Sequence, residues 1–115
     1  MKKCNYRRGV AAGLMLLAGG AFAGAPENRA ELANMVIQDC GSCHGLTMRG
    51  GLGPPLRPDD LKQQTVESIA AIIKEGVDGT AMPPWKPLLT DEQIFWISRQ
   101  LKSGALLTDE TKDAR

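Results

Sequence analysis

Apolar residues recur at helical spacing in three separate segments, and no segment alternates apolar and polar residues as a strand does. In the first segment, Leu32, Val36 and Cys40 lie four residues apart on one face of a helix that begins at Glu27. This helix leads directly into the sequence Cys-Gly-Ser-Cys-His at residues 40–44. The pattern predicts an all-α domain whose first helix leads into a segment with two cysteine thiols and a histidine imidazole.

A second helix is predicted between Thr65 and Gly76. Threonine is a good N-cap because its hydroxyl accepts a hydrogen bond from the first helical turn, and glycine is favoured just after a helix. Its apolar face is formed by Ile69, Ile72 and Ile73.

The last helix has the clearest beginning. Thr90 followed three residues later by Gln93 is a capping-box pattern, and Gly104 marks the end of the helix. Its apolar positions are Ile94, Ile97 and Leu101. Residues 46–60 and 77–89 are interrupted by glycine and proline and are predicted as loops, with a short turn around residues 59–64.

The N-terminal residues resemble an export signal, and we do not expect them to belong to the folded domain. Residues 1–10 carry four basic residues and no acid, residues 11–23 are apolar, and Ala-Phe-Ala at 21–23 is a cleavage pattern. We expect a signal peptide over residues 1–23, leaving a single domain over residues 24–115 with no membrane anchor. The alternative is an uncleaved anchor, but a membrane span needs about 20 apolar residues.

Removing the signal changes the charge of the chain. The remaining 92 of 115 residues keep all 13 acids but only 10 of 14 basic residues, a net charge of −3. Nucleic acid is therefore not an expected partner, because phosphate binding needs clustered cations. Within residues 24–115, Trp85, Phe95 and Trp96 are the only Phe, Tyr or Trp residues, and a core with so few large side chains usually needs a cross-link or a cofactor.

The Cys-x-x-Cys-His spacing at residues 40–44 is the attachment signature of a c-type haem. The thiols of Cys40 and Cys43 can form thioethers with the two vinyl groups on one haem edge, and the imidazole of His44 then reaches the iron. Three alternatives are weaker. A structural zinc site needs four ligands, and a thioredoxin-like redox pair needs a βαβ pattern. The third alternative is a plain disulfide, which an exported compartment would permit.

A second axial ligand can come from methionine, because His44 is the only histidine. Met35 lies in the first helix, where core filling is its ordinary role, and Met48 is too close to His44 to reach the opposite haem face. Met82 lies 38 residues beyond His44, in a loop stiffened by two prolines. We predict that Met82 is the ligand, with a buried non-ligand methionine as the alternative.

Two further contacts with the haem site are predicted. The carbonyl of Pro54 is the candidate partner for the second nitrogen of His44, because ligating histidines are usually held by such an acceptor; these prolines could instead only shape a turn. Arg57 and Trp85 are the preferred donors to the haem propionates, although Trp85 could equally be haem-packing core. The other candidate donors are Arg49, Lys62 and Lys86.

Together these residues resemble the class I c-type cytochromes. The likeness extends over the whole domain: the attachment sequence at 40–44, Gly-Pro-Pro-Leu at 53–56, Lys-Glu-Gly at 74–76, Met-Pro-Pro at 82–84 and Leu-Thr-Asp-Glu at 89–92. The resemblance implies three to four helices wrapped round one covalent haem c, with the N- and C-terminal helices crossing. It also implies a one-electron carrier, not an enzyme, and places thioether, proximal and distal roles on Cys40, Cys43, His44 and Met82.

Residues 41–54 and 82–86 further resemble the small periplasmic cytochromes encoded beside dissimilatory nitrite reductase. That likeness implies a role in denitrification, as electron donor to the reductase, with maturation of its haem d1 as the alternative. A five-coordinate haem protein that binds a ligand at the iron is a third hypothesis for the function. We expect redox proteins, such as nitrite reductase or haem d1 biosynthesis proteins, as partners, and a monomer, with a helix-swapped dimer as the alternative.

One position departs from the family. Many members carry an aromatic residue before the leucine of the last helix, where this chain has Gln100 before Leu101. Phe95 or Trp96 could substitute for it by packing on the first helix. A solvent-facing Trp96 would instead be a docking element.

Overall fold

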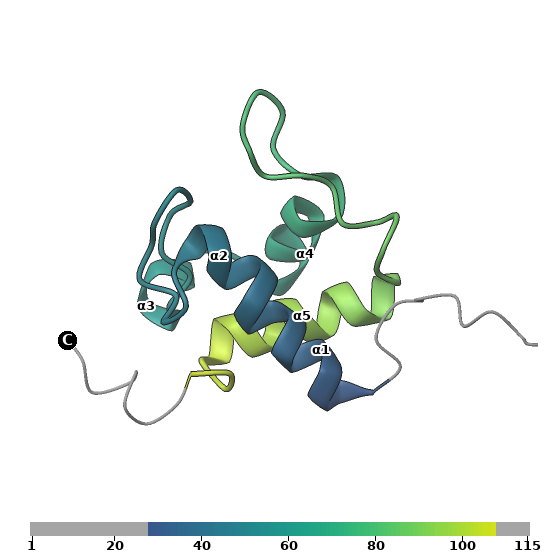
Figure 1. Cartoon of the computed structure of the whole chain (residues 1–115), viewed down its shortest axis with the longest axis horizontal. Coiled ribbons are helices and arrows are strands. Elements are labelled where there is room, and N and C mark those ends of the chain that lie inside the picture. The colour runs from purple at the N-terminus through teal and green to yellow at the C-terminus, as the bar shows by residue number, and fades with distance from the viewer. Residues whose placement is uncertain (1–27, 108–115) are drawn as a thin grey trace, which may run out of the picture.

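The computed structural model describes residues 28–107, and in this part of the chain every regular element is helical (Figure 1). None of the described helices is long and apolar enough to cross a membrane. The all-α prediction is confirmed. The elements are α1 (Arg29–Met35), η1 (Val36–Cys40), α2 (Gly41–His44), α3 (Pro58–Leu61), α4 (Val66–Glu75) and α5 (Asp91–Ser103).

The first three elements form one uninterrupted helical stretch from Arg29 to His44. It begins two residues later than predicted, at an Asn28 cap whose side chain accepts a hydrogen bond from the Glu31 N–H at 2.8 Å. Its middle part, η1, is a π-helix. A π-helix holds more residues per turn than an α-helix, so the helix is widened where it enters the attachment sequence, and the widened segment includes Cys40.

Both later helices begin and end where the sequence predicts. The Thr65 hydroxyl accepts from the Ser68 N–H at 3.1 Å and begins α4, which ends at Gly76. Thr90 and Gln93 form the reciprocal capping box of α5, with hydrogen bonds of 2.9 and 3.2 Å. Local capping chemistry therefore fixes the ends of both helices.

The core lies where α4 and α3 pack against α5. Ile69 and Ile73 are buried in it, whereas Ile72 is 37% exposed. The predicted apolar face of three isoleucines therefore has only two buried members. Ile69, Ile72 and Ile73 all lie on one side of the helix, with Ile72 at the exposed edge of that face. The buried set is completed by Leu32, Val36, Met48, Leu61, Ala70, Leu89, Ile94, Ile97, Leu101 and Leu107.

The first helix crosses the last, as expected (Figure 1). The guanidinium of Arg29 in α1 is 3.0 Å from the Glu92 carboxylate in α5 and lies over the Trp96 ring, 5.1 Å from its centroid. Trp96 packs partly buried against the core, whereas Phe95 is 38% exposed. Trp96 is thus the aromatic residue at the helix crossing, as core packing on the first helix requires.

Candidate functional site

His44 is the last residue of α2, and its imidazole is held by the loop that follows. Its Nδ1 lies 2.6 Å from the carbonyl oxygen of Pro54. Because that oxygen can only accept, Nδ1 carries the proton in the neutral ring, and the lone pair remains on Nε2. The backbone of the same residue is fixed as well, since its carbonyl accepts from the Gly50 N–H at 2.8 Å. The imidazole therefore presents a defined metal-binding nitrogen.

Gly53 brings the backbone of this loop against the imidazole. A Cβ at residue 53 would lie 2.6 Å from Cε1 and 2.8 Å from Nδ1 of His44. The Gly53 N–H donates to the Cys43 carbonyl at 2.9 Å. A glycine is thus needed at residue 53 for the loop backbone to pack directly against the His44 imidazole. The sequence reasoning did not single out Gly53, although its place directly before Pro54 is a signal for such a contact.

Cys40 and Cys43 lie three residues apart at the end of the same helical stretch, as half-buried free thiols. They are not joined as a disulfide. Burial, and secondly the charge of Asp39, raises the pKa of the Cys40 thiol to about 11. The Ser42 hydroxyl between them donates to the Asp39 carbonyl at 2.7 Å. Cys40 therefore sits in apolar surroundings that suit the edge of a porphyrin.

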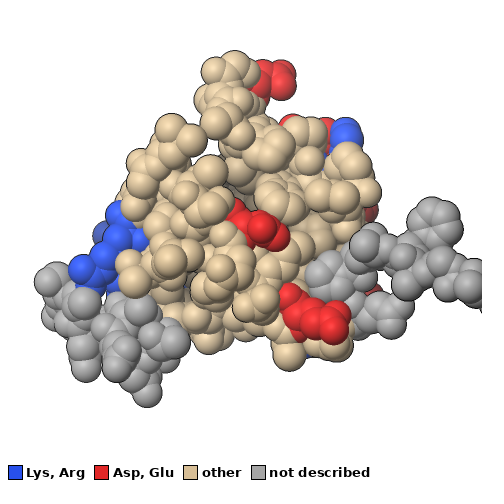
Figure 2. All heavy atoms as spheres, in the orientation of Figure 1, with Lys and Arg blue, Asp and Glu red and all other residues tan. Residues whose placement is uncertain are grey.

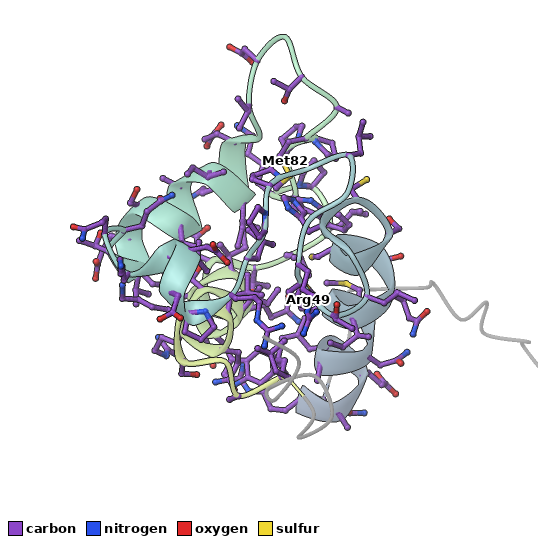
Figure 3. The ribbon with its side chains drawn as sticks, turned by 90° about the vertical axis from the view of Figure 1, so that its left-hand side faces the viewer. Arg49 and Met82 are labelled. Carbon is purple, nitrogen blue, oxygen red and sulfur yellow. The ribbon has the colours of Figure 1, made fainter. Side chains whose placement is uncertain are left out.

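Met82 lies half-buried in the loop that joins α4 to α5, and its side chain packs against the core (Figure 3). Its carbonyl accepts from the Val77 N–H at 3.1 Å, and its N–H donates to the Thr80 hydroxyl at 3.2 Å. The far end of the loop is fixed by the Trp85 N–H, which donates to the Ile73 carbonyl at 3.0 Å. The loop is therefore hydrogen-bonded within itself at Met82 and is tied to α4 beyond it, through Trp85.

The other two candidate methionines belong to the core. Met48 is 1% exposed and has a φ of 57°, in the left-handed region that few residues other than glycine adopt. Its carbonyl accepts from the Leu56 N–H at 2.9 Å. Met35 is partly buried in α1 and packs against the same core. Met35 thus has the packing role that its place in the first helix indicates, and the structure shows a packing role for Met48 as well.

The two preferred propionate donors come from different segments. Arg57 is the half-buried N-cap residue of α3, and its N–H donates to the Asp60 carboxylate at 3.3 Å. Trp85 packs half-buried against the core at the end of the Met82 loop. Arg49 is exposed and lies lower in Figure 3 than Met82. Lys86 forms an ion pair with Glu75 at 2.6 Å.

The residues at this site fit a covalently attached haem. Two free thiols at the required spacing lie beside an imidazole whose Nε2 is available, and the Met82 thioether is held in a separate, anchored loop. Among the described residues, no group of three or more His, Cys, Asp and Glu side chains is placed to hold a metal ion by itself. The donor set is that of a haem protein and not of a structural zinc site.

Comparison with known proteins agrees with this chemistry. The family model described as "Cytochrome C oxidase, cbb3-type, subunit III" matches residues 27–99. The chain belongs to the c-type cytochromes, and its cofactor is covalently bound haem c.

Individual relatives narrow the likeness. "Cytochrome c55X" of Paracoccus denitrificans is 50% identical over 90 residues, covering 76% of this chain and 87% of that protein. "Cytochrome c55X" of Stutzerimonas stutzeri is 43% identical over 100 residues, covering 85% and 88%. The solved structure of "c-type cytochrome NirC" aligns with a TM-score of 0.68 at 41% identity and covers 72% of this chain and 100% of that one. The chain is a small monohaem cytochrome of the class I type, and such proteins transfer electrons.

Proposed function

We propose that this protein is a periplasmic one-electron carrier whose haem iron is ligated by His44 and Met82. The observation that carries the proposal is the 2.6 Å contact between His44 Nδ1 and the Pro54 carbonyl, which leaves Nε2 for the iron. Cys40 and Cys43 would hold the porphyrin as thioethers. Bound haem supplies a reversible one-electron exchange at iron.

Each protein group has a defined part in this proposal. The Pro54 carbonyl orients the imidazole and keeps its proton on Nδ1, which raises the basicity of the ligating nitrogen. The thioether of Met82 is a soft ligand that favours ferrous iron and raises the reduction potential. With His44 and Met82 both holding the iron, no site would remain for a substrate, and the bound haem would supply electron transfer alone. Arg57 and Trp85 are proposed to donate to the propionates.

The test of the ligand assignment is spectroscopic. We expect a low-spin haem in both redox states and no binding of carbon monoxide to the resting ferrous form. Rapid carbon monoxide binding would favour the five-coordinate, ligand-binding alternative, because it requires Met82 to be off the iron.

A role in denitrification, as electron donor to nitrite reductase, is the physiological function we propose. The resemblance of residues 41–54 and 82–86 to cytochromes encoded beside that reductase supports it, as does the similarity to NirC. The second candidate is a maturation factor for haem d1, whose redox chemistry would be the same. Deleting the gene and measuring haem d1 in the reductase distinguishes them: full haem d1 content with slowed turnover indicates the carrier, and loss of haem d1 indicates maturation.

The partner surface is proposed to be basic. The expected mature chain has a net charge of −3, and two haem propionates would add to it. The face that carries α1, η1 and α2 is largely uncharged, with scattered acidic groups and with basic groups confined to its edges (Figure 2). Weak, transient contacts are typical of redox partners. Association rates should fall with ionic strength; rates insensitive to salt would contradict a basic partner.

Export to the periplasm is proposed from the signal-like residues 1–23, which lie outside the described part of the chain. Intact mass measurement of the protein from a host with haem-attachment machinery provides the test. A mass that corresponds to residues 24–115 plus one haem supports cleavage after Ala23 and covalent attachment of the haem. The full-length mass would support the uncleaved anchor.

A further inference from the structure

Gly76, the residue that ends α4, has a backbone conformation reserved for glycine. Its φ of 69° and ψ of −168° fall in a region that residues with a Cβ essentially do not occupy. Its N–H still donates to the Ile72 carbonyl at 2.8 Å. The helix therefore ends in this extended, glycine-only conformation and not in the common left-handed one.

Gly76 also lies directly against the segment that carries Met82. A Cβ at residue 76 would meet the Met82 carbonyl oxygen, the Pro83 carbonyl carbon and the Pro84 nitrogen, each at 2.7 Å. All three are backbone atoms, so none can swing aside as a flexible side chain would. The two prolines also restrict how the segment can bend.

The neighbouring hydrogen bonds prevent this segment from moving away as a unit. Trp85 and Lys86 donate their N–H groups to the Ile73 and Lys74 carbonyls, at 3.0 and 3.3 Å. The Lys86 ammonium also lies 2.6 Å from Glu75. Since residues 85 and 86 are bound to α4, a displacement at residues 82–84 would be taken up by the Met82 end.

We propose that Gly76 is a positioning residue for the distal methionine, setting the depth at which the Met82 thioether is held relative to His44. This inference rests on the proposed His44/Met82 ligation. According to this inference, Gly76 affects the strength of the sulfur–iron bond. A glycine that only ended the helix would not affect that bond.

Gly79 provides a matched control in the same loop. It also has a positive φ, of 74°, but a Cβ there would meet nothing within 4 Å. Gly79→Ala therefore adds a methyl group to a positive-φ glycine of this loop without contact with residues 82–84. Gly76→Ala adds the same methyl group against the methionine segment.

The experiment compares wild type, Gly76→Ala, Gly79→Ala and Met82→Ala as haem-loaded proteins. Two quantities are measured on the ferric form: the far-red charge-transfer band of the sulfur–iron bond, and the affinity for added imidazole, which competes with Met82. We expect Gly76→Ala to weaken or lose the band and to bind imidazole at least about tenfold more tightly, since backbone strain of this kind is of that order. Gly79→Ala should resemble wild type in both.

The outcomes separate the two proposals. If wild type itself lacks the band and binds imidazole like Met82→Ala, the ligand assignment fails. If wild type shows the band and Gly76→Ala matches it in band and affinity, the positioning role fails while the ligation stands. Haem content and far-ultraviolet circular dichroism are measured in parallel; a Gly76→Ala protein that loses haem and helical structure together would show a general folding role and would also overturn the inference.

Discussion

The Pro54 carbonyl oxygen and the His44 imidazole nitrogen Nδ1 lie 2.6 Å apart, joining the end of α2 to a loop ten residues further along the chain. This contact selects the tautomer that leaves Nε2 for a metal. It also fixes the ring orientation, which a helix end would not fix by itself. The hydrogen bonds around Gly50 and Gly53 keep the loop in place.

The loop should tolerate no side chain at residue 53. In Gly53→Ala the new methyl group would lie 2.6 Å from the imidazole, and overpacking of this kind costs about 1–3 kcal/mol. We expect a lower unfolding free energy of the haem-loaded protein by denaturant titration, together with a shifted Soret maximum. Gly41→Ala is the milder comparison, because its Cβ would lie 3.2 Å from the tip of the Leu46 side chain and 3.3 Å from the Leu46 Cα, and we expect a smaller loss of stability there. Equal stabilities of the two variants would contradict the close approach.

The α4–α5 core can be tested at two residues of α5. Ile97 is 1% exposed, and replacing it with alanine leaves a cavity that costs about 2–5 kcal/mol. Phe95 is 38% exposed, so Phe95→Ala should cost less than Ile97→Ala although it removes more atoms. Urea unfolding followed by circular dichroism measures both, and the reverse order would show that the helix is rotated from the described position.

Lys102 should stabilise the domain through carbonyl groups and not through an ion pair. Its ammonium donates to the carbonyl oxygens of Leu61 and Lys62, at 3.0 and 3.3 Å, and to that of Gln64, joining α5 to the end of α3. Hydrogen bonds from a charged donor are stronger than neutral ones. Lys102→Met should lower the unfolding free energy by about 1–3 kcal/mol. The exposed Lys62 is the control, and Lys62→Met should change stability by less than about 0.5 kcal/mol.

The Lys74–Asp91 ion pair predicts a change in stability at alkaline pH. The hydrogen bond to Asp91, and secondly its charge, raises the pKa of Lys74 above 10.5. The stabilising contribution is therefore complete below pH 10.5 and is lost as the pH rises through the folded-state pKa. The effect is small because both groups are exposed. Thermal midpoints of wild type and Lys74→Met should converge only in this alkaline range, and a difference independent of pH would contradict the pairing.

Much of the fold could be predicted from the sequence because its determinants are local. The Thr65 and Thr90 caps each involve side chains and N–H groups within three residues, and the structure has both. The spacing of Ile94, Ile97 and Leu101 likewise defined the buried stripe of α5. The cofactor was predictable for the same reason, since Cys40, Cys43 and His44 are adjacent in the chain.

The features that the sequence did not show depend on contacts between distant segments. The π-helical turn of η1 leaves no local pattern in Val-Ile-Gln-Asp-Cys. The close approach of Gly76 to residues 82–84 depends on how the loop returns to α4. The choice between Phe95 and Trp96 at the helix crossing depends on which of these adjacent residues faces the first helix, and the contact of Arg29 with Trp96 decides it.

The absorption spectrum of the purified, haem-loaded protein, recorded beside that of Met82→Ala, is the most direct measurement of a haem c held by two cysteines between His44 and Met82. The wild-type spectrum should show a low-spin haem in both oxidation states and a far-red sulfur–iron band in the ferric form, and Met82→Ala should lose that band while keeping the haem attached. A high-spin ferrous haem in wild type, or a band that persists in Met82→Ala, would contradict the proposed site.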